Sequence, residues 1–212
     1  NPIIDGKAKQ EKRILSAQET KLLLDSSKGG MMYPIFVVAL GTGMRIGEIL
    51  GLTWDCVDFE KEVIRVEKTL SYLPGDGKMA LYEFHKPKTM AGYRRIPMTR
   101  VVKKVLVIQK DRREHIATMF SPREGFENLV FTSKTNNPLN ASNIKDSINY
   151  IVAKINRENP DFYFEHLTPH GLRHTFATNC IERGMTPKTL QKIMGHSSLQ
   201  MTMDLYCHVR ED

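Results

Sequence analysis

Six side chains of this sequence are of the types that phosphoryl transfer without a metal ion requires. The transition state of that transfer spreads extra negative charge over two non-bridging phosphate oxygens, and a fork-shaped guanidinium that is always charged is suited to bind them. Preorganised charges of this kind are commonly the largest single contribution to catalysis. The six candidates are Arg45, Lys88, His170, Arg173, His196 and Tyr206.

Tyr206 is the candidate nucleophile. A phenol with a pKa of about 10 attacks poorly, but two nearby arginines favour the phenolate and a histidine can accept the proton. The attack forms a phosphotyrosine, which preserves the energy of the phosphodiester, so that a hydroxyl group can later reverse the attack without a nucleotide cofactor. The leaving oxygen needs a proton, which Lys88 can supply as general acid. Lys86, two residues earlier, competes for this role.

Glu48 stands three residues after Arg45 and is expected to orient its guanidinium. A buried arginine needs such a partner, because an unpaired buried charge is costly. The alternative is an ordinary helix residue that faces solvent.

Helix signals place these candidates at the ends of elements. Ser16 and Glu19 form a capping box that starts a helix running through residues 22–24. Residues 31–40 are apolar nearly all round, as in a buried helix, and Gly41-Thr42-Gly43 breaks this helix just before Arg45. Arg45 is therefore expected at a helix junction.

Two Thr-Pro pairs mark later helix starts, because each places an N-cap acceptor before a proline at the first helical position. Thr168-Pro169 opens a helix that carries His170 and Arg173 on one face, and Thr186-Pro187 opens another that ends at Gly195. A final helix from about 198 to 208 carries Tyr206. Two longer amphipathic helices are predicted at 101–116 and 144–155.

Strand signals lie between the two halves. Alternating apolar and charged residues at 62–70 predict a strand, and Pro74-Gly75-Asp76-Gly77 predicts a turn into a second strand. Residues 93–98 are the third strand, reached through a hairpin connection that holds Lys88. The expected fold class is α+β, mostly α-helical, with a small three-stranded antiparallel sheet.

Composition agrees with a polyanionic partner. The 212 residues carry a formal net charge of +7, which favours nucleic acid but also fits a merely basic surface. Three cysteines without Cys-x-x-Cys spacing predict reduced thiols. The longest apolar run falls far short of the roughly 18 residues of a membrane span. We expect residues 1–13 to be a linker or the boundary of a longer protein, and residues 14–212 to be one domain.

Four motifs in order resemble the tyrosine recombinase (phage-type integrase) family. They are Thr42-Gly43-Met44-Arg45-Ile46-Gly47-Glu48, then His170-Gly171-Leu172-Arg173-His174-Thr175-Phe176-Ala177, then Gly195-His196-Ser197-Ser198, and finally Tyr206-Cys207-His208. No single motif is decisive, but four in order, with a Lys-Thr pair between them, make coincidence improbable. The segments 45–48 and 86–97 look closest to integrases of conjugative transposons. Gly171 departs from the family pattern, in which aspartate is common, at a position without charge in the mechanism.

The resemblance implies a catalytic domain that cleaves and rejoins double-stranded DNA through a 3′-phosphotyrosyl link, for integration and excision of a mobile element. It assigns Lys88 as general acid, His170 as acid/base partner and His196 as a phosphate hydrogen-bond donor. It implies no cofactor and no metal, a bacterial cytoplasmic location, and no membrane. It also implies N-terminal DNA-binding domains absent from this chain, a homotetramer of the full-length protein on DNA, and a monomer for this chain alone.

Two other functions compete with this interpretation. Residues 189–206 have the rhythm of a helix-turn-helix, so a non-enzymatic DNA-binding regulator is the first rival. A type IB topoisomerase, which shares the chemistry, is the second. The even spacing of His166, His170 and His174 suggests a metal site superficially, but Pro169 starts the helix after His166. Tyr206 taken alone could simply be a packed amphipathic tyrosine.

Overall fold

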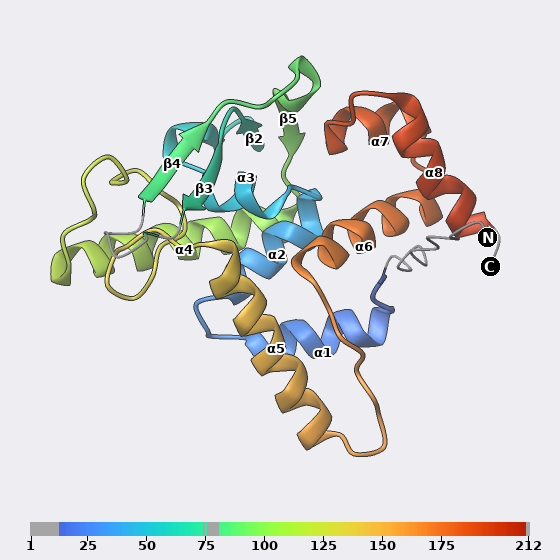
Figure 1. Ribbon diagram of the computed structural model, residues 1–212, viewed down its shortest axis with the longest axis horizontal. Coiled ribbons are helices and arrows are strands. Elements are labelled where there is room, and N and C mark those ends of the chain that lie inside the picture. The colour runs from blue at the N-terminus through green and yellow to red at the C-terminus, as the bar shows by residue number, and fades with distance from the viewer. Residues whose placement is uncertain (1–12, 74, 76–80, 211–212) are drawn as a thin grey trace, which may run out of the picture.

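Helices form about half of the chain, and the strands lie together on one side of them (Figure 1). The computed structural model describes residues 13–73, 75 and 81–210. The predicted boundary segment 1–13 therefore lies, except for Arg13, outside the described residues. The helices are α1 (Ala17–Ser27), α2 (Tyr33–Thr42), α3 (Ile46–Leu50), α4 (Arg100–Met119), α5 (Ala141–Glu158), α6 (Pro169–Glu182), α7 (Pro187–Met194) and α8 (Leu199–Arg210), with 3₁₀ turns η1 (Trp54–Cys56) and η2 (Met90–Gly92).

The predicted helix starts are confirmed by the cap geometry. Ser16 and Glu19 form the capping box of α1, and the side chains of Thr168 and Thr186 accept hydrogen bonds at the starts of α6 and α7. These caps satisfy backbone N–H groups that have no partner within the helix. Local chemistry therefore sets where these helices begin.

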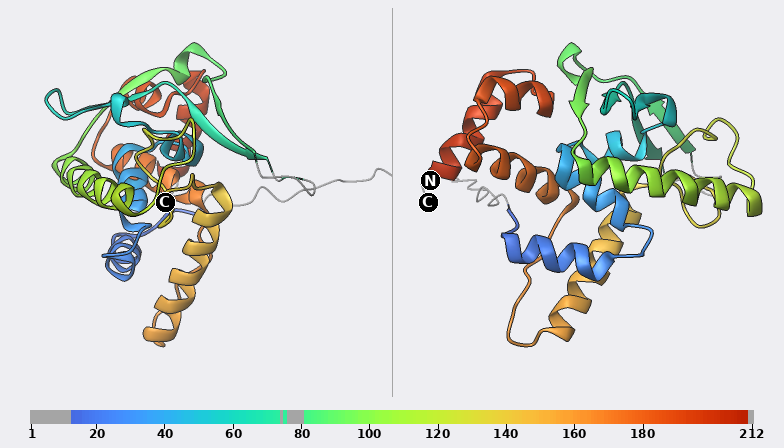
Figure 2. Two further views of the ribbon diagram at one scale, coloured as in Figure 1. Left: turned by 90° about the vertical axis from the view of Figure 1, so that its left-hand side faces the viewer. Right: turned by 180° about the vertical axis from the view of Figure 1, so that it is seen from behind.

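The strands form two antiparallel sheets. The three-stranded sheet has the order β1 (Val57–Asp58), β2 (Val63–Val66) and β5 (Arg94–Pro97). A separate pair joins β3 (Thr69–Leu73) to β4 (Leu81–His85) and projects from the body of the molecule (Figure 2).

The prediction of one continuous strand over 62–70 is wrong. The chain leaves the first sheet at Glu67 and Lys68, so that β2 pairs with β5 while β3 pairs with β4. Ile64, Val66 and Leu70 are all buried, so the alternation continues across the break and cannot reveal it. Of the predicted turn at 74–77, only Gly75 is among the described residues.

The main core surrounds α2, whose side chains are buried nearly all round. Helix α2 packs against α4 and α6. Helices α1 and α5 lie on the side of α2 that is opposite the sheets (Figure 1). In the described part of the chain, no helix combines the length and apolar character needed to cross a membrane.

A second, smaller apolar cluster joins the last three helices. Its buried members are Phe176, Ala177, Ile181, Leu190, Met194, Leu205 and Tyr206. Helices α7 and α8 thus pack on α6 at the end of the molecule opposite the β3–β4 pair (Figure 2). The candidate site lies where α7 meets α3 and β5.

Candidate active site

Arg45 is held at a helix junction, as its sequence context predicts. Helix α2 ends at Gly43, whose φ of 63° is a left-handed conformation that glycine adopts without a steric cost. Two residues later Arg45 is the N-cap of α3, and its backbone N–H donates to Glu48 Oε2 at 2.8 Å. The junction turns the guanidinium away from the core, and the side chain stays 41% exposed.

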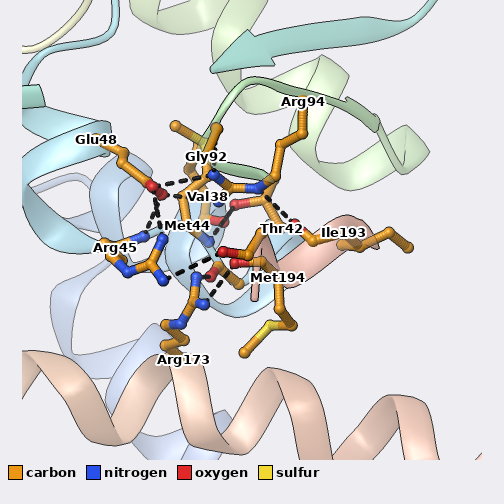
Figure 3. Close-up of polar contacts among 12 residues, drawn as sticks. Val38, Thr42, Met44, Arg45, Glu48, Gly92, Arg94, Arg173, Ile193 and Met194 are labelled. Atoms are coloured by element: carbon orange, nitrogen blue, oxygen red, sulfur yellow. Dashed lines mark hydrogen bonds and ion pairs between the residues drawn. The ribbon is translucent and has the colours of Figure 1, made fainter. Parts of the chain in front are cut away.

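Glu48 lies between two arginines (Figure 3). Its Oε1 accepts from Arg45 Nη1 and from Arg94 Nη1, both at 3.0 Å, and its Oε2 accepts from Arg94 Nη2 at 2.7 Å. Burial alone would raise the pKa of Glu48, but the hydrogen bonds and charges of Arg94 and Arg45 more than offset it and hold the pKa below its usual value. The prediction that Glu48 orients Arg45 agrees with these contacts.

Arg173 is buried beneath Arg45. Only 3% of it is exposed, and it donates from Nη1 to Gly43 O at 2.5 Å and from Nη2 to Met194 O at 2.6 Å (Figure 3). Burial, with the positive charges of Arg45 and Arg94, lowers the pKa of Arg173 to about 9, against a partial offset from Glu48. Arg173 is therefore charged at neutral pH, and two of its five N–H donors are held by the backbone.

His196 follows the left-handed C-cap of α7 at Gly195 and is buried. Its Nδ1 lies 2.9 Å from Thr202 Oγ1, within hydrogen-bonding distance. Burial and the charges of Arg173, Arg45 and Arg94 lower the pKa of His196 to about 4. The ring is therefore neutral at pH 7 and has one N–H to donate, as the predicted role of a phosphate donor requires.

Lys88 lies across a hollow of about 790 Å³ from Arg45. The loop between β4 and β5 carries it, and its side chain is exposed. This loop connects the two sheets, so it is not the hairpin connection that the sequence predicted. Lys86 lines the same hollow, and Gly195 and Ser197 close another side of it.

His170 lies exposed in the first turn of α6, as predicted. Its ring packs edge-on against that of His174, with centroids 4.4 Å apart, and its charge contributes to the lowered pKa of His196. His166 precedes the helix. Within the described ranges, no three His, Cys, Asp or Glu side chains are grouped as metal ligands.

Tyr206 does not lie beside the two arginines that its predicted role as nucleophile requires. Its ring is buried in the cluster on α6 and α7, and its hydroxyl donates to Met185 O, before the start of α7. Arg173 and Arg45 reach carbonyls at the other end of this eight-residue helix, about 12 Å away at 1.5 Å per residue. The physical reason is that an amphipathic tyrosine gains from burying its ring and bonding its hydroxyl to a carbonyl.

Two residues with roles in this site were not predicted. Arg94 binds Glu48 from β5, although the sequence shows only an Arg94-Arg95 pair with no sign of which side chain points inward. Thr202 contacts His196 from α8. The sequence holds no local signal that connects Arg94 with Glu48.

Together these groups concentrate positive charge in one region. Arg45 and Lys88 line an open hollow, and the buried guanidinium of Arg173 binds the carbonyls of Gly43 and Met194 close to it, beside the buried ring of His196. Fixed positive charge beside a hollow suits phosphoryl transfer, where negative charge develops on oxygen. Fold and site thus define the class of a helical phosphoryl-transfer domain.

Comparison with known proteins supplies the family. Residues 7–212 match the Phage integrase family. The transposase from transposon Tn916 of Enterococcus faecalis is 34% identical over 210 residues, which cover 95% of this chain and 49% of the transposase. A XerC-like tyrosine recombinase of Caldanaerobacter subterraneus subsp. tengcongensis is 30% identical over 213 residues, which cover 97% of this chain and 52% of the recombinase.

A solved structure shows the same fold. The integrase of transposon Tn1549, in complex with transposon right end DNA, superposes with a TM-score of 0.84 at 32% identity, over 96% of this chain and 64% of that one. The chain belongs to the phage integrase family of tyrosine recombinases, and the predicted likeness to conjugative-transposon integrases is confirmed. It spans about half the length of the curated relatives it matches.

Proposed function

We propose that this chain carries the centre at which an integrase cleaves and rejoins DNA strands. Tyr206 attacks the scissile phosphorus, the bond to the 5′ oxygen breaks, and a 3′-phosphotyrosyl link forms. Arg45 and Arg173 stabilise the charge on the non-bridging oxygens, and His196 donates a hydrogen bond to one of them. His170 accepts the tyrosine proton, Lys88 protonates the leaving 5′ oxygen, and attack by a 5′ hydroxyl reverses the steps.

The observation that carries this proposal is the gathering of cationic groups from separate segments around one hollow. Arg45 comes from the α2–α3 junction and Lys86 and Lys88 come from the β4–β5 loop, while Gly195 at the end of α7 lines the same hollow. Arg173 joins them by binding the carbonyls of Gly43 and Met194. Packing alone does not require such a concentration of positive charge, because like charges at close range repel.

The nucleophile reaches the hollow in this scheme when α8 leaves its place on α6 and α7. What holds α8 there is a small apolar cluster and the hydroxyl bond to Met185, with the contact between His196 and Thr202 at its start. DNA bound over the hollow supplies the phosphate that attracts the arginines. Helix α8 then exchanges one packed position for another.

Lys88 is the better candidate for the general acid than Lys86. Both line the hollow beside Arg45, but Lys86 also lines a neighbouring surface pocket with Arg65, Glu67 and Arg95. Lys86 therefore stands at the edge of the hollow. A 5′-bridging phosphorothiolate, whose sulfur leaves without a proton, should restore cleavage by Lys88→Ala and leave Lys86→Ala unaffected.

The proposed substrate of the whole protein is double-stranded DNA at the ends of a mobile element, which it integrates and excises in the bacterial cytoplasm. The relatives that support this are a transposase from Tn916 and a Tn1549 integrase in complex with transposon right end DNA. We further propose that residues 14–212 act as one domain, that the full-length protein forms a homotetramer on DNA, and that this chain alone is a monomer. Sedimentation of the 212-residue chain as a tight tetramer would contradict the last point.

The decisive experiment is a denaturing gel for a covalent protein–DNA adduct. The substrates are nicked suicide duplexes that carry the Tn1549 right end and, in parallel, a library of nicked duplexes of random sequence, all in chelator. The native chain should give an adduct that Tyr206→Phe abolishes, and Tyr150→Phe, an exposed tyrosine on α5, should behave as the native chain.

Other outcomes separate the rival functions. An adduct that survives Tyr206→Phe would exclude the assigned nucleophile, and binding without any adduct would support the helix-turn-helix regulator. Relaxation of supercoils without strand transfer to a second duplex would support the topoisomerase.

A further inference from the structure

Arg94, at the start of β5, binds buried polar groups of three separate segments. Its Nη1 and Nη2 donate to the two oxygens of Glu48 on α3, its Nε donates to Ile193 O on α7 at 2.6 Å, and its Nη1 also donates to Gly92 O at 3.1 Å (Figure 3). Its side chain is only 4% exposed. Four of the five N–H bonds of a guanidinium are used in this way, so Arg94 is committed to protein groups and not to a phosphate.

The Glu48 carboxylate connects Arg94 to Arg45. One oxygen accepts from both guanidiniums, and the other accepts from Arg94 and from the backbone N–H of Arg45. Of the two arginines, the 41% exposed Arg45 faces the hollow and the buried Arg94 lies behind it. Any shift of Arg94 therefore moves the anchor of Arg45.

The chain at the end of α7 lies directly on Arg94. A Cβ at Gly195 would come within 3.0 Å of Arg94 Cδ and Nη1 and 2.9 Å of Ala91 O. Ala91 belongs to the loop that carries Lys88, and Gly195 immediately precedes His196. The loop that carries Lys88, the side chain of Arg94 and the segment that carries His196 are therefore packed directly on one another.

We propose that Arg94 is a positioning residue for strand cleavage: it fixes Arg45 through the shared carboxylate of Glu48 and holds the Lys88 loop against the end of α7. This inference rests on the proposed function, because it concerns the same centre. Arg94 touches no reacting atom in this scheme. Its effect is to keep Arg45, Lys88 and His196 in a single geometry.

Lysine cannot replace Arg94 in this role. An ammonium keeps the positive charge but is a compact donor group, whereas the planar guanidinium binds both carboxylate oxygens and two carbonyls at once. Arg94→Lys therefore tests geometry with little change of charge. Arg95→Lys is the matched control, because Arg95 is the next residue of the same strand and is exposed.

The test measures single-turnover cleavage of the suicide duplex that gives the strongest adduct, with either a normal phosphodiester or a methylphosphonate at the scissile position. The methylphosphonate lacks the charge that Arg45 stabilises. Arg94→Lys should slow phosphodiester cleavage on the order of 10²-fold, as expected for a misplaced catalytic group. The loss on the methylphosphonate should be a few-fold, and the DNA dissociation constant and Arg95→Lys should show little change.

A double-mutant cycle checks the route through Arg45. Arg94→Lys should slow the Arg45→Lys variant far less than it slows the native chain, because the two changes share the interaction through Glu48. If Arg94→Lys does not fold, Glu48→Asp replaces it in the same test, since it retracts the carboxylate from both arginines and keeps every charge.

Equal losses on both substrates, additivity with Arg45→Lys, or no loss at all would overturn the inference. The adduct experiment distinguishes this failure from failure of the proposed function. If Tyr206→Phe abolishes the adduct but Arg94 shows none of the expected pattern, the cleavage centre stands and only the positioning role falls.

Discussion

Polar side chains are held by different interactions at the two ends of α7. At its C-terminal end, Glu48, Arg94 and Arg173 are buried and bonded to one another or to backbone carbonyls, and these bonds fix the direction of both guanidiniums. At its N-terminal end, the ring of Tyr206 lies among apolar side chains and its hydroxyl donates to Met185 O. Hydrophobic packing is non-directional, and a typical hydrogen bond adds only about 1 kcal/mol net.

This contrast indicates that the charge-stabilising groups and the proposed nucleophile are held in different ways. Groups that stabilise charge act only if they are in place before the reaction, so a stiff ionic network suits them. The proposed nucleophile is needed only when DNA is present, and a modest apolar seat allows it to leave. The five predictions below test this contrast.

Glu48→Gln should have the largest effect on stability. It leaves Arg94 as a buried charge without its counter-ion, and breaking a buried pair typically costs about 3–5 kcal/mol. Urea unfolding followed by circular dichroism measures the change. A loss below about 1 kcal/mol would show that the ionic network at the C-terminal end of α7 is held no more firmly than Tyr206 at its N-terminal end.

Arg45→Lys should slow cleavage strongly while leaving folding nearly intact. Its guanidinium faces the hollow, and removing one preorganised donor commonly lowers the rate roughly 10²–10³-fold. The unfolding midpoint should change little, because the side chain is partly exposed. Single-turnover adduct formation beside thermal unfolding separates the two, and equal damage to both would contradict the assignment.

The free energy of unfolding should depend on pH through His196, which follows the C-terminal end of α7. The folded-state pKa of His196 is about 4, below its usual value near 6.5, so the unfolded chain binds the proton more readily between these values. Stability is therefore full above about pH 6.5 and falls as the pH drops toward 4, by up to roughly 1.4 kcal/mol per unit of depression. The lowered pKa of Glu48 adds a loss in the same direction at more acid pH.

His196→Asn should flatten the upper part of this pH profile. Asparagine can keep the contact with Thr202 but does not titrate. An unchanged slope between pH 6.5 and pH 5 would show that other groups cause it.

Gly195→Ala should cost more than Gly184→Ala. Both glycines have positive φ, at 64° and 80°, so each substitution costs about 1 kcal/mol for the backbone. Only at Gly195 would the new Cβ also press on Arg94 and Ala91, whereas nothing lies within 4 Å at Gly184. Equal losses in unfolding free energy would mean that Arg94 and Ala91 move aside at little cost in free energy.

Tyr206→Phe should have only a modest effect on stability, although it abolishes the adduct. It removes the hydroxyl bond to Met185 but keeps the buried ring, so the loss is about 0.5–1.5 kcal/mol. Hydrogen exchange of α8 should rise while that of α2 stays unchanged. A loss as large as that of Glu48→Gln would erase the contrast between the two ends.

Much of this site could be predicted because its signals are local. The Thr-Pro pairs that start α6 and α7 and the glycines that end α2 and α7 act within a few residues, and the structure confirms each. They place Arg45, Arg173 and His196 at element ends without any knowledge of the fold. The paired role of Arg45 and Glu48 is local too, since they share the first turn of α3.

Arg94 could not be predicted, because its role depends on strand register. Arg94 pairs with Val66 and Arg95 with Arg65, and neighbouring residues of a strand point to opposite faces. A shift by one residue would exchange the two arginines. Arg94 and Glu48 are 46 positions apart in the sequence, so their contact leaves no local trace.

The amino-acid sequence by itself determined the family and the starts of α1, α6 and α7, since these follow from residue types and short-range capping. Only the tertiary structure decided which arginine turns inward, how deeply Arg173 is buried and which end of α7 holds the hydroxyl of Tyr206. Those outcomes depend on competition among distant partners for the same buried space. Such competition is resolved by packing and by the cost of an unpaired buried charge.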